Sequence, residues 1–119
     1  MFVYTPRVAA KYGEQLNAVL DDLIVTANSA AQNSQVAMSL RQVGALKVTP
    51  RRIIVGDLVA ALKAVAASDD PTLPPNADFA GVAAKRAELG ADVVVFLTAF
   101  GDYSVGCANG SNCMVGAAW

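Results

Sequence analysis

The chain has 119 residues, a formal net charge of −1 and no histidine. This length suits one domain with a sizeable core. Without imidazole, these residues cannot form a Ser-His-Asp triad, a histidine general base or a histidine-ligated zinc site. The near-neutral charge, with Arg51-Arg52 as the one basic cluster, argues against nucleic-acid binding.

Hydropathy predicts neither a membrane span nor a secretory leader. The longest near-continuous apolar stretch, Ala91–Phe100, is about half the length that crosses a bilayer. Met1–Tyr4 leads directly into sequence typical of a folded domain, without a basic region or a small-residue cleavage site. We therefore expect no membrane partner.

A strand and a long helix are expected first. Phe2–Tyr4 is a β-prone run that Thr5-Pro6 interrupts, because proline lacks a ladder donor. Apolar residues then recur every three or four positions, which predicts one helix from about Ala9 to Ala31. Its apolar face consists of Leu16, Val19, Leu20, Leu23, Ile24, Ala27 and Ala31. Mixed alternation between Met38 and Val48 predicts a second strand with one solvated face.

The second half of the chain predicts two further helices and a buried strand. The second helix begins near Asp57 and ends near Ser68, before a proline-rich loop. Asp78 is expected to cap a third helix, which Gly90 ends in the left-handed conformation. The continuous β-branched run Ala91–Thr98 predicts a strand that is buried on both faces.

This order of elements predicts an α/β fold with a mostly parallel, twisted sheet and crossover helices. The tail from Gly101 is glycine-rich, and Met114–Trp119 is predicted as a short final strand. The sequence contains no internal repeat. We therefore treat 1–119 as a single domain.

The acidic residues do not indicate a catalytic pair, which would need two carboxylates facing one cavity. Asp57 and Asp78 fit helix starts, and Asp69-Asp70 fits a solvated turn. Asp92 and Asp102 have no evident partner. We assign no catalytic residue and no metal ligand.

Two cysteines, Cys107 and Cys113, flank an Asn109-Gly110 turn. We favour a disulfide between them if the compartment is oxidising, and free structural thiols or metal and redox chemistry remain alternatives. Two thiolates fall short of the four ligands of a structural zinc site. Asn109-Gly110-Ser111 also matches the glycosylation acceptor pattern, which acts only in a eukaryotic secretory route.

Several segments together resemble the N-terminal portion of the catalytic domain of reprolysin-like (adamalysin-type) zinc metallopeptidases of the metzincin clan. Their positions follow the family's order, from an opening strand and turn to a helix-to-strand junction and an edge strand. They are Val3–Pro6, Ala27–Val36 with Ser39–Val43, Asp57-Leu58, Leu89–Val94 and Cys113–Trp119.

The resemblance implies a partial zincin-like subdomain with an antiparallel edge strand, secreted or extracytoplasmic in the intact protein. In the family, zinc is bound by a later helix with the pattern HExxHxxGxxH, whose glutamate is the general base. The present chain has neither these histidines nor that glutamate, so it resembles an incomplete domain, inactive as given and without a cofactor of its own. A shortened piece of a peptidase and a stand-alone chain that has lost catalysis are both open.

The resemblance also implies which residues would bind a substrate. The family's edge strand lines the cleft, and an extended peptide or protein substrate pairs with its backbone. The corresponding residues here are Val115, Gly116, Ala117, Ala118 and Trp119. The alternative is a terminal strand that packs Val115 and Trp119 on the sheet.

In the family a later strand separates this edge strand from the central one. We therefore expect Met114–Trp119 to lack a neighbour and to be loosely attached, rather than paired with Val93–Leu97. A different class also remains open for the whole chain: a small non-enzymatic α/β domain that serves assembly or interaction.

Overall fold

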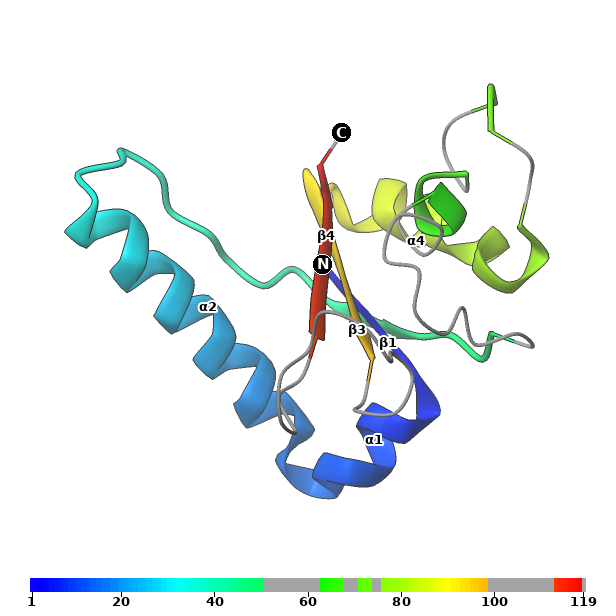
Figure 1. The fold of residues 1–119 in the computed structure, drawn as a ribbon, viewed down its shortest axis with the longest axis horizontal. Coiled ribbons are helices and arrows are strands. Elements are labelled where there is room, and N and C mark those ends of the chain that lie inside the picture. Colours follow the sequence, from blue (N-terminus) through cyan, green and yellow to red (C-terminus); the bar gives the residue numbers. More distant parts are fainter. Residues whose placement is uncertain (51–62, 68–70, 74–75, 99–112, 119) are drawn as a thin grey trace.

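The computed structural model describes residues 1–50, 63–67, 71–73, 76–98 and 113–118, the last of these by backbone. Four strands form one sheet in the order β2-β1-β3-β4 (Figure 1). They are β1 (Phe2–Tyr4), β2 (Ala45–Lys47), β3 (Val93–Thr98) and β4 (Cys113–Ala118). β2, β1 and β3 are parallel, and the backbone of β4 runs antiparallel along β3.

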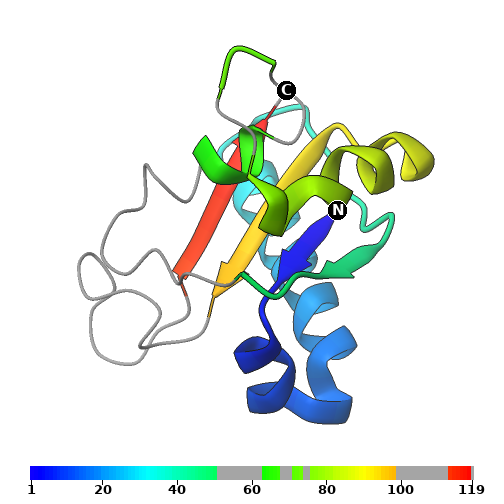
Figure 2. The ribbon, with the colours of Figure 1, turned by 90° about the vertical axis from the view of Figure 1, so that its right-hand side faces the viewer.

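Helices cover both faces of the sheet (Figure 2). The first crossover comprises α1 (Pro6–Tyr12), the 3-10 turn η1 (Gly13–Gln15) and α2 (Leu16–Asn33). The second contains a helical turn at 63–66, the 3-10 turn η2 (Ala77–Phe79) and α4 (Ala80–Leu89). The predicted α/β class with parallel strands and crossover helices is confirmed.

Alternation along the strands divides the core into two clusters, because successive side chains of a strand point to opposite faces. Val3, Val94 and Phe96 pack toward α4, where the rings of Phe79 and Phe96 meet edge to face with centroids 5.3 Å apart. Phe2 and Leu97 pack toward α1 and α2. β3 lies between β1 and β4 and its last residues are buried, as the continuous apolar run predicts.

The prediction of one helix from Ala9 to Ala31 is wrong in its first part. The helical backbone begins at Pro6, whose missing N–H costs nothing in a first turn, and α1 ends at Tyr12, where Gly13 is the C-cap with φ 52°. A 3-10 turn then redirects the chain into α2. On α2, Leu20 and Ala31 of the predicted face are buried.

Two other elements differ from expectation. The strand predicted between Met38 and Val48 is limited to β2. The Asn76 side chain, rather than that of Asp78, caps the segment before α4 by accepting a hydrogen bond from the Asp78 N–H at 3.0 Å. Gly90 ends α4 in the left-handed region, with φ 59° and ψ 41°, as predicted.

The start of the predicted second helix at Asp57 lies outside the described residues, as do Asp69-Asp70 and Asp102. Among the helices that are described, none is long and apolar enough to cross a membrane.

Candidate functional site

The outer edge of β4 is the candidate site, since β4 ends the strand order. All six of its residues pair with β3, from Val93 opposite Ala118 to Thr98 opposite Cys113. The expectation that this segment lacks a neighbour is therefore wrong. β1 pairs with one edge of β3. The other edge of β3 is therefore available to the returning backbone of β4.

The hydrogen bonds between β1 and β3 reveal which backbone groups of β3 face β4. The Met1 amine donates to the Val93 carbonyl at 2.6 Å, and the Val95 N–H donates to the Met1 carbonyl at 3.0 Å. The Thr5 N–H donates to the Leu97 carbonyl at 3.3 Å. The backbone groups of Val93, Val95 and Leu97 therefore point toward β1, and those of the intervening residues point toward β4.

The register then determines the outward groups of β4. Met114, Gly116 and Ala118 lie opposite the β3 residues that face β1. In an antiparallel pair these are the non-hydrogen-bonded positions, whose N–H and C=O groups point away from the partner strand. Within the described ranges no strand covers this edge, so it offers a row of donors and acceptors.

The structure thus brings Val115, Gly116, Ala117 and Ala118 together in β4, while Trp119 lies outside the described residues. Cys107 is also outside them, and Cys113 is described by its backbone, so the disulfide remains a prediction.

Two threonines at the carboxyl ends of β1 and β3 were not singled out by the sequence. Thr5 and Thr98 are 6% and 3% exposed, and neither Oγ1 has a hydrogen-bond partner among the residues that the structure describes. Thr98 also lines a cavity of about 110 Å³ with Val8, Tyr12 and Leu16. Threonine is common in strands, so the sequence carries no signal for an unpaired hydroxyl.

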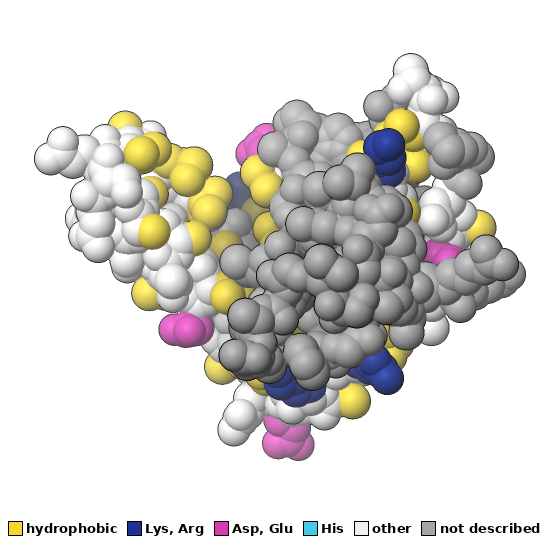
Figure 3. Space-filling model, in the orientation of Figure 1, with side chains coloured by type: hydrophobic (Ala, Val, Ile, Leu, Met, Phe, Trp, Pro, Cys, Tyr) yellow, Lys and Arg dark blue, Asp and Glu magenta, His cyan; other side chains and the backbone are white. Residues whose placement is uncertain are grey.

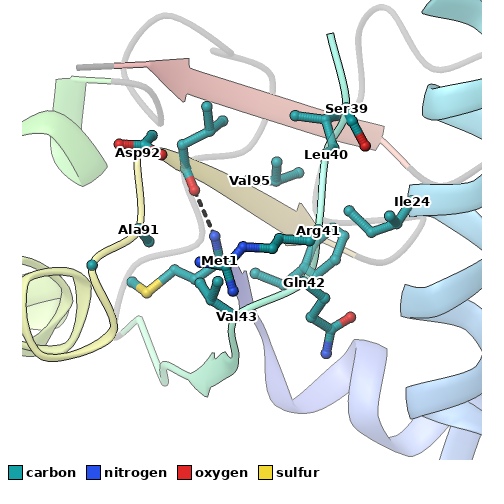
Figure 4. Close-up of a pocket in the computed structure, with 13 residues that line it drawn as sticks. Met1, Ile24, Ser39, Leu40, Arg41, Gln42, Val43, Ala91, Asp92 and Val95 are labelled. Carbon is teal, nitrogen blue, oxygen red and sulfur yellow. Dashed lines mark hydrogen bonds between the residues drawn. The ribbon is translucent and has the colours of Figure 1, made fainter. Parts of the chain in front are cut away.

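A larger cavity of about 400 Å³ lies at the amino ends of the strands (Figure 4). Its wall includes Met1, Ile24, Arg41 and Asp92. Burial lowers the pKa of the Met1 amino group, and the nearby Asp92 carboxylate opposes this shift. The amine is thus held in a partly desolvated position.

No group of three or more metal-ligating side chains occurs among the residues that the structure describes. Comparison with protein families, curated proteins and solved structures found no match to this chain.

Proposed function

We propose that this chain is the N-terminal portion of a reprolysin-like zinc endopeptidase domain, and that β4 is the strand on which an extended peptide substrate is held. The observation that carries the proposal is the outward row of backbone groups at Met114, Gly116 and Ala118. Added strands gain affinity from such main-chain hydrogen bonds.

The connections around the sheet support the same proposal. The resemblance depends in part on Val3–Pro6, which spans the end of β1 and the start of α1, and on Leu89–Val94, which spans the end of α4 and the start of β3. β1 and β3 are parallel neighbours in the sheet. In each segment a short connection joins strand and helix: only Thr5 separates β1 from α1, and Gly90 ends α4 shortly before β3.

The residues present do not fit the family's zinc. The chain contains no histidine, and the described part contains no cluster of alternative ligands. Peptide-bond hydrolysis, and a secreted or extracytoplasmic location, therefore belong to the proposed intact domain. This chain contributes the substrate-holding edge.

Titration of the 119-residue protein with an extended peptide, followed by amide NMR, tests this role. The N–H signals of Met114, Gly116 and Ala118 should shift more than those of Val94 and Phe96. The N–H groups of Val94 and Phe96 already form hydrogen bonds between β3 and β4, so they are not available to the peptide. Equal or absent shifts at the outward positions would contradict the proposal.

A matched pair of variants sharpens the test. Gly116→Pro removes one outward donor, and proline is tolerated when its missing N–H faces away from the partner strand. Gly116→Ala keeps the donor. Peptide binding should weaken in the first variant and persist in the second.

Sequencing the reading frame downstream of Trp119 separates this function from the rival one. An in-frame HExxH pattern would support the peptidase. A stop codon directly after Trp119 would instead favour a stand-alone chain.

One observation favours the rival, a non-enzymatic interaction domain. Hydrophobic side chains gather near the free end of α2 and the segment that follows it (Figure 3). Val25, Val36 and Met38 are 61%, 52% and 52% exposed. Concentration-dependent self-association that is lost in Val36→Ser would support this alternative.

A further inference from the structure

The sheet reverses its strand order between β1 and β3. From β1 the chain passes through α1 and α2 to β2 on one side of β1, and from β2 it returns through α4 to β3 on the other side. These two crossovers cover opposite faces of the sheet (Figure 2). In open α/β sheets, ligands bind in the crevice outside the carboxyl ends of the strands at such a switch point. A small-molecule site is therefore expected at the carboxyl ends of β1 and β3.

Thr5 and Thr98 lie side by side at these two ends. In the parallel pair, Tyr4 is in register with Leu97, and the Thr5 N–H donates to the Leu97 carbonyl at 3.3 Å. Thr5 keeps an extended backbone, with φ −86° and ψ 161°, so the next step of the register places it beside Thr98. Because side chains alternate along a strand, the threonine side chains both share the face of Val3.

Both hydroxyls are buried, and within the described part of the chain neither has a hydrogen-bond partner. A buried polar group is normally satisfied, so an exception calls for a water, an ion or a functional role. Thr5 is the N-cap residue of α1, yet its side chain makes no capping hydrogen bond. Folding has already removed water from these two groups, and a ligand that bonds to them restores the hydrogen bonds that were lost.

The spacing of the two threonines suits one acceptor oxygen. Neighbouring strands lie about 4.8 Å apart. This separation is less than twice the roughly 2.7 Å of an O–H···O hydrogen bond, so an oxygen between the two hydroxyls can accept from both.

The charges at this edge favour an anionic oxygen. The described segments that end or follow the parallel strands, 4–12, 46–50 and 96–98, contain Arg7, Lys11 and Lys47 and no acidic residue. A carboxylate is attracted to such a surface, whereas an amine finds no opposite charge in these segments.

Space for an apolar group lies at the same edge. The cavity of about 110 Å³ that Thr98 lines has a mainly aliphatic wall, formed by Val8, Leu16, Val19, Leu23 and Leu97 with Tyr12. One water takes up roughly 30 Å³ in the liquid, so the cavity has room for about four non-hydrogen atoms. A short aliphatic chain fits this volume.

We propose that the carboxyl ends of β1 and β3 bind a short aliphatic carboxylate. One of its oxygens accepts hydrogen bonds from the Thr5 and Thr98 hydroxyls, and its chain enters the cavity beside α1. This site is formed by β1, β3 and their helices, so it does not depend on the peptide-binding role of β4.

Titration of the 119-residue protein with isobutyrate, followed by amide NMR, tests the proposal. The signals of Thr5 and Thr98 should shift saturably. Thr5→Val and Thr98→Val should each weaken binding about tenfold or more, because each removes a hydrogen bond to a charged group. Thr98→Ser keeps the hydroxyl and should bind within a few-fold of the parent.

Two controls separate this site from other effects. Thr49→Val changes an exposed threonine that follows β2, and should leave the affinity unchanged. Isobutanol has the same carbon skeleton without the charge, and should bind at least tenfold more weakly. The melting temperatures of Thr5→Val and Thr98→Val should not fall, so weaker binding cannot be attributed to unfolding.

Three results would overturn the proposal. The first is the absence of saturable shifts at Thr5 and Thr98. The second is equal affinity in Thr98→Val and Thr49→Val, or for isobutanol and isobutyrate. The third is a long-lived water detected at the two hydroxyls that isobutyrate does not displace, since the pair would then bind a structural water.

Discussion

Replacing Asn28 by alanine tests what holds the long connection between α2 and β2 in place. The Leu40 N–H donates to the Asn28 Oδ1 at 2.6 Å, and the Asn28 Nδ2 donates to the Leu40 carbonyl at 2.8 Å. One amide thus satisfies both backbone groups of a residue outside regular secondary structure. Asn28→Ala removes both bonds together.

The expected loss follows from these two bonds. Each hydrogen bond contributes about 0.5–1.5 kcal/mol net, and the half-buried Leu40 groups regain some water when released. Alanine returns about 0.5 kcal/mol through its higher helix propensity. The net destabilisation should be about 1–2 kcal/mol, or about 4–8 °C in melting temperature for a domain of this size.

Thermal and urea unfolding measured by circular dichroism give these values, and amide exchange at Leu40 should accelerate. The control is Ser29→Ala, whose hydroxyl donates to the Val25 carbonyl within the exposed side of α2. That variant should stay within about 0.5 kcal/mol of the parent. If the two variants unfold alike, or if Leu40 keeps its protection, the reasoning is wrong.

Three further predictions concern single positions. Gly90→Ala should lower the free energy of unfolding in urea by about 1–2 kcal/mol, because φ at this position is 59°. Gly81→Ala, with no atom within 4 Å of the added Cβ, should be neutral or stabilising, and equal effects of the two variants would contradict this. The lowered pKa of the Met1 amine means that the unfolded chain binds this proton more tightly, so stability should rise with pH in the window just below its ordinary value of 8.0, and an acetylated chain should lack that slope. Thr98→Val should stabilise the fold by about 1 kcal/mol by removing a buried hydroxyl that has no partner in the described part of the chain, and a lower melting temperature would show that the hydroxyl is satisfied.

Predictions from the sequence were correct where a few neighbouring residues determine the local conformation. Gly90 ends α4 because glycine enters the left-handed region without a Cβ clash, and this depends on no distant residue. The run Val93–Thr98 is a buried strand because its β-branched side chains suit a pleated surface with helices on both sides. The break at Gly13 was missed because the apolar spacing continues through it.

The candidate site was predictable in part. The sequence located a strand at the end of the chain, and β4 covers Cys113–Ala118. Which of its backbone groups face outward follows from the register with β3, and hence from the hydrogen bonds of β3 to Met1 and Thr5. No property of the residues Met114, Gly116 and Ala118 themselves encodes it.

The sequence by itself determined the α/β class, the alternation that gives the sheet two apolar faces, and the glycine that ends α4. Tertiary structure alone decided that β4 pairs directly with β3, that Asn28 holds Leu40, and that a cavity opens beside Met1. The physical reason is the separation in sequence over which each kind of interaction acts. Helix caps and side-chain periodicity act within a few residues, whereas strand partners and cavities depend on backbone groups that are distant in sequence and meet only after the chain has folded.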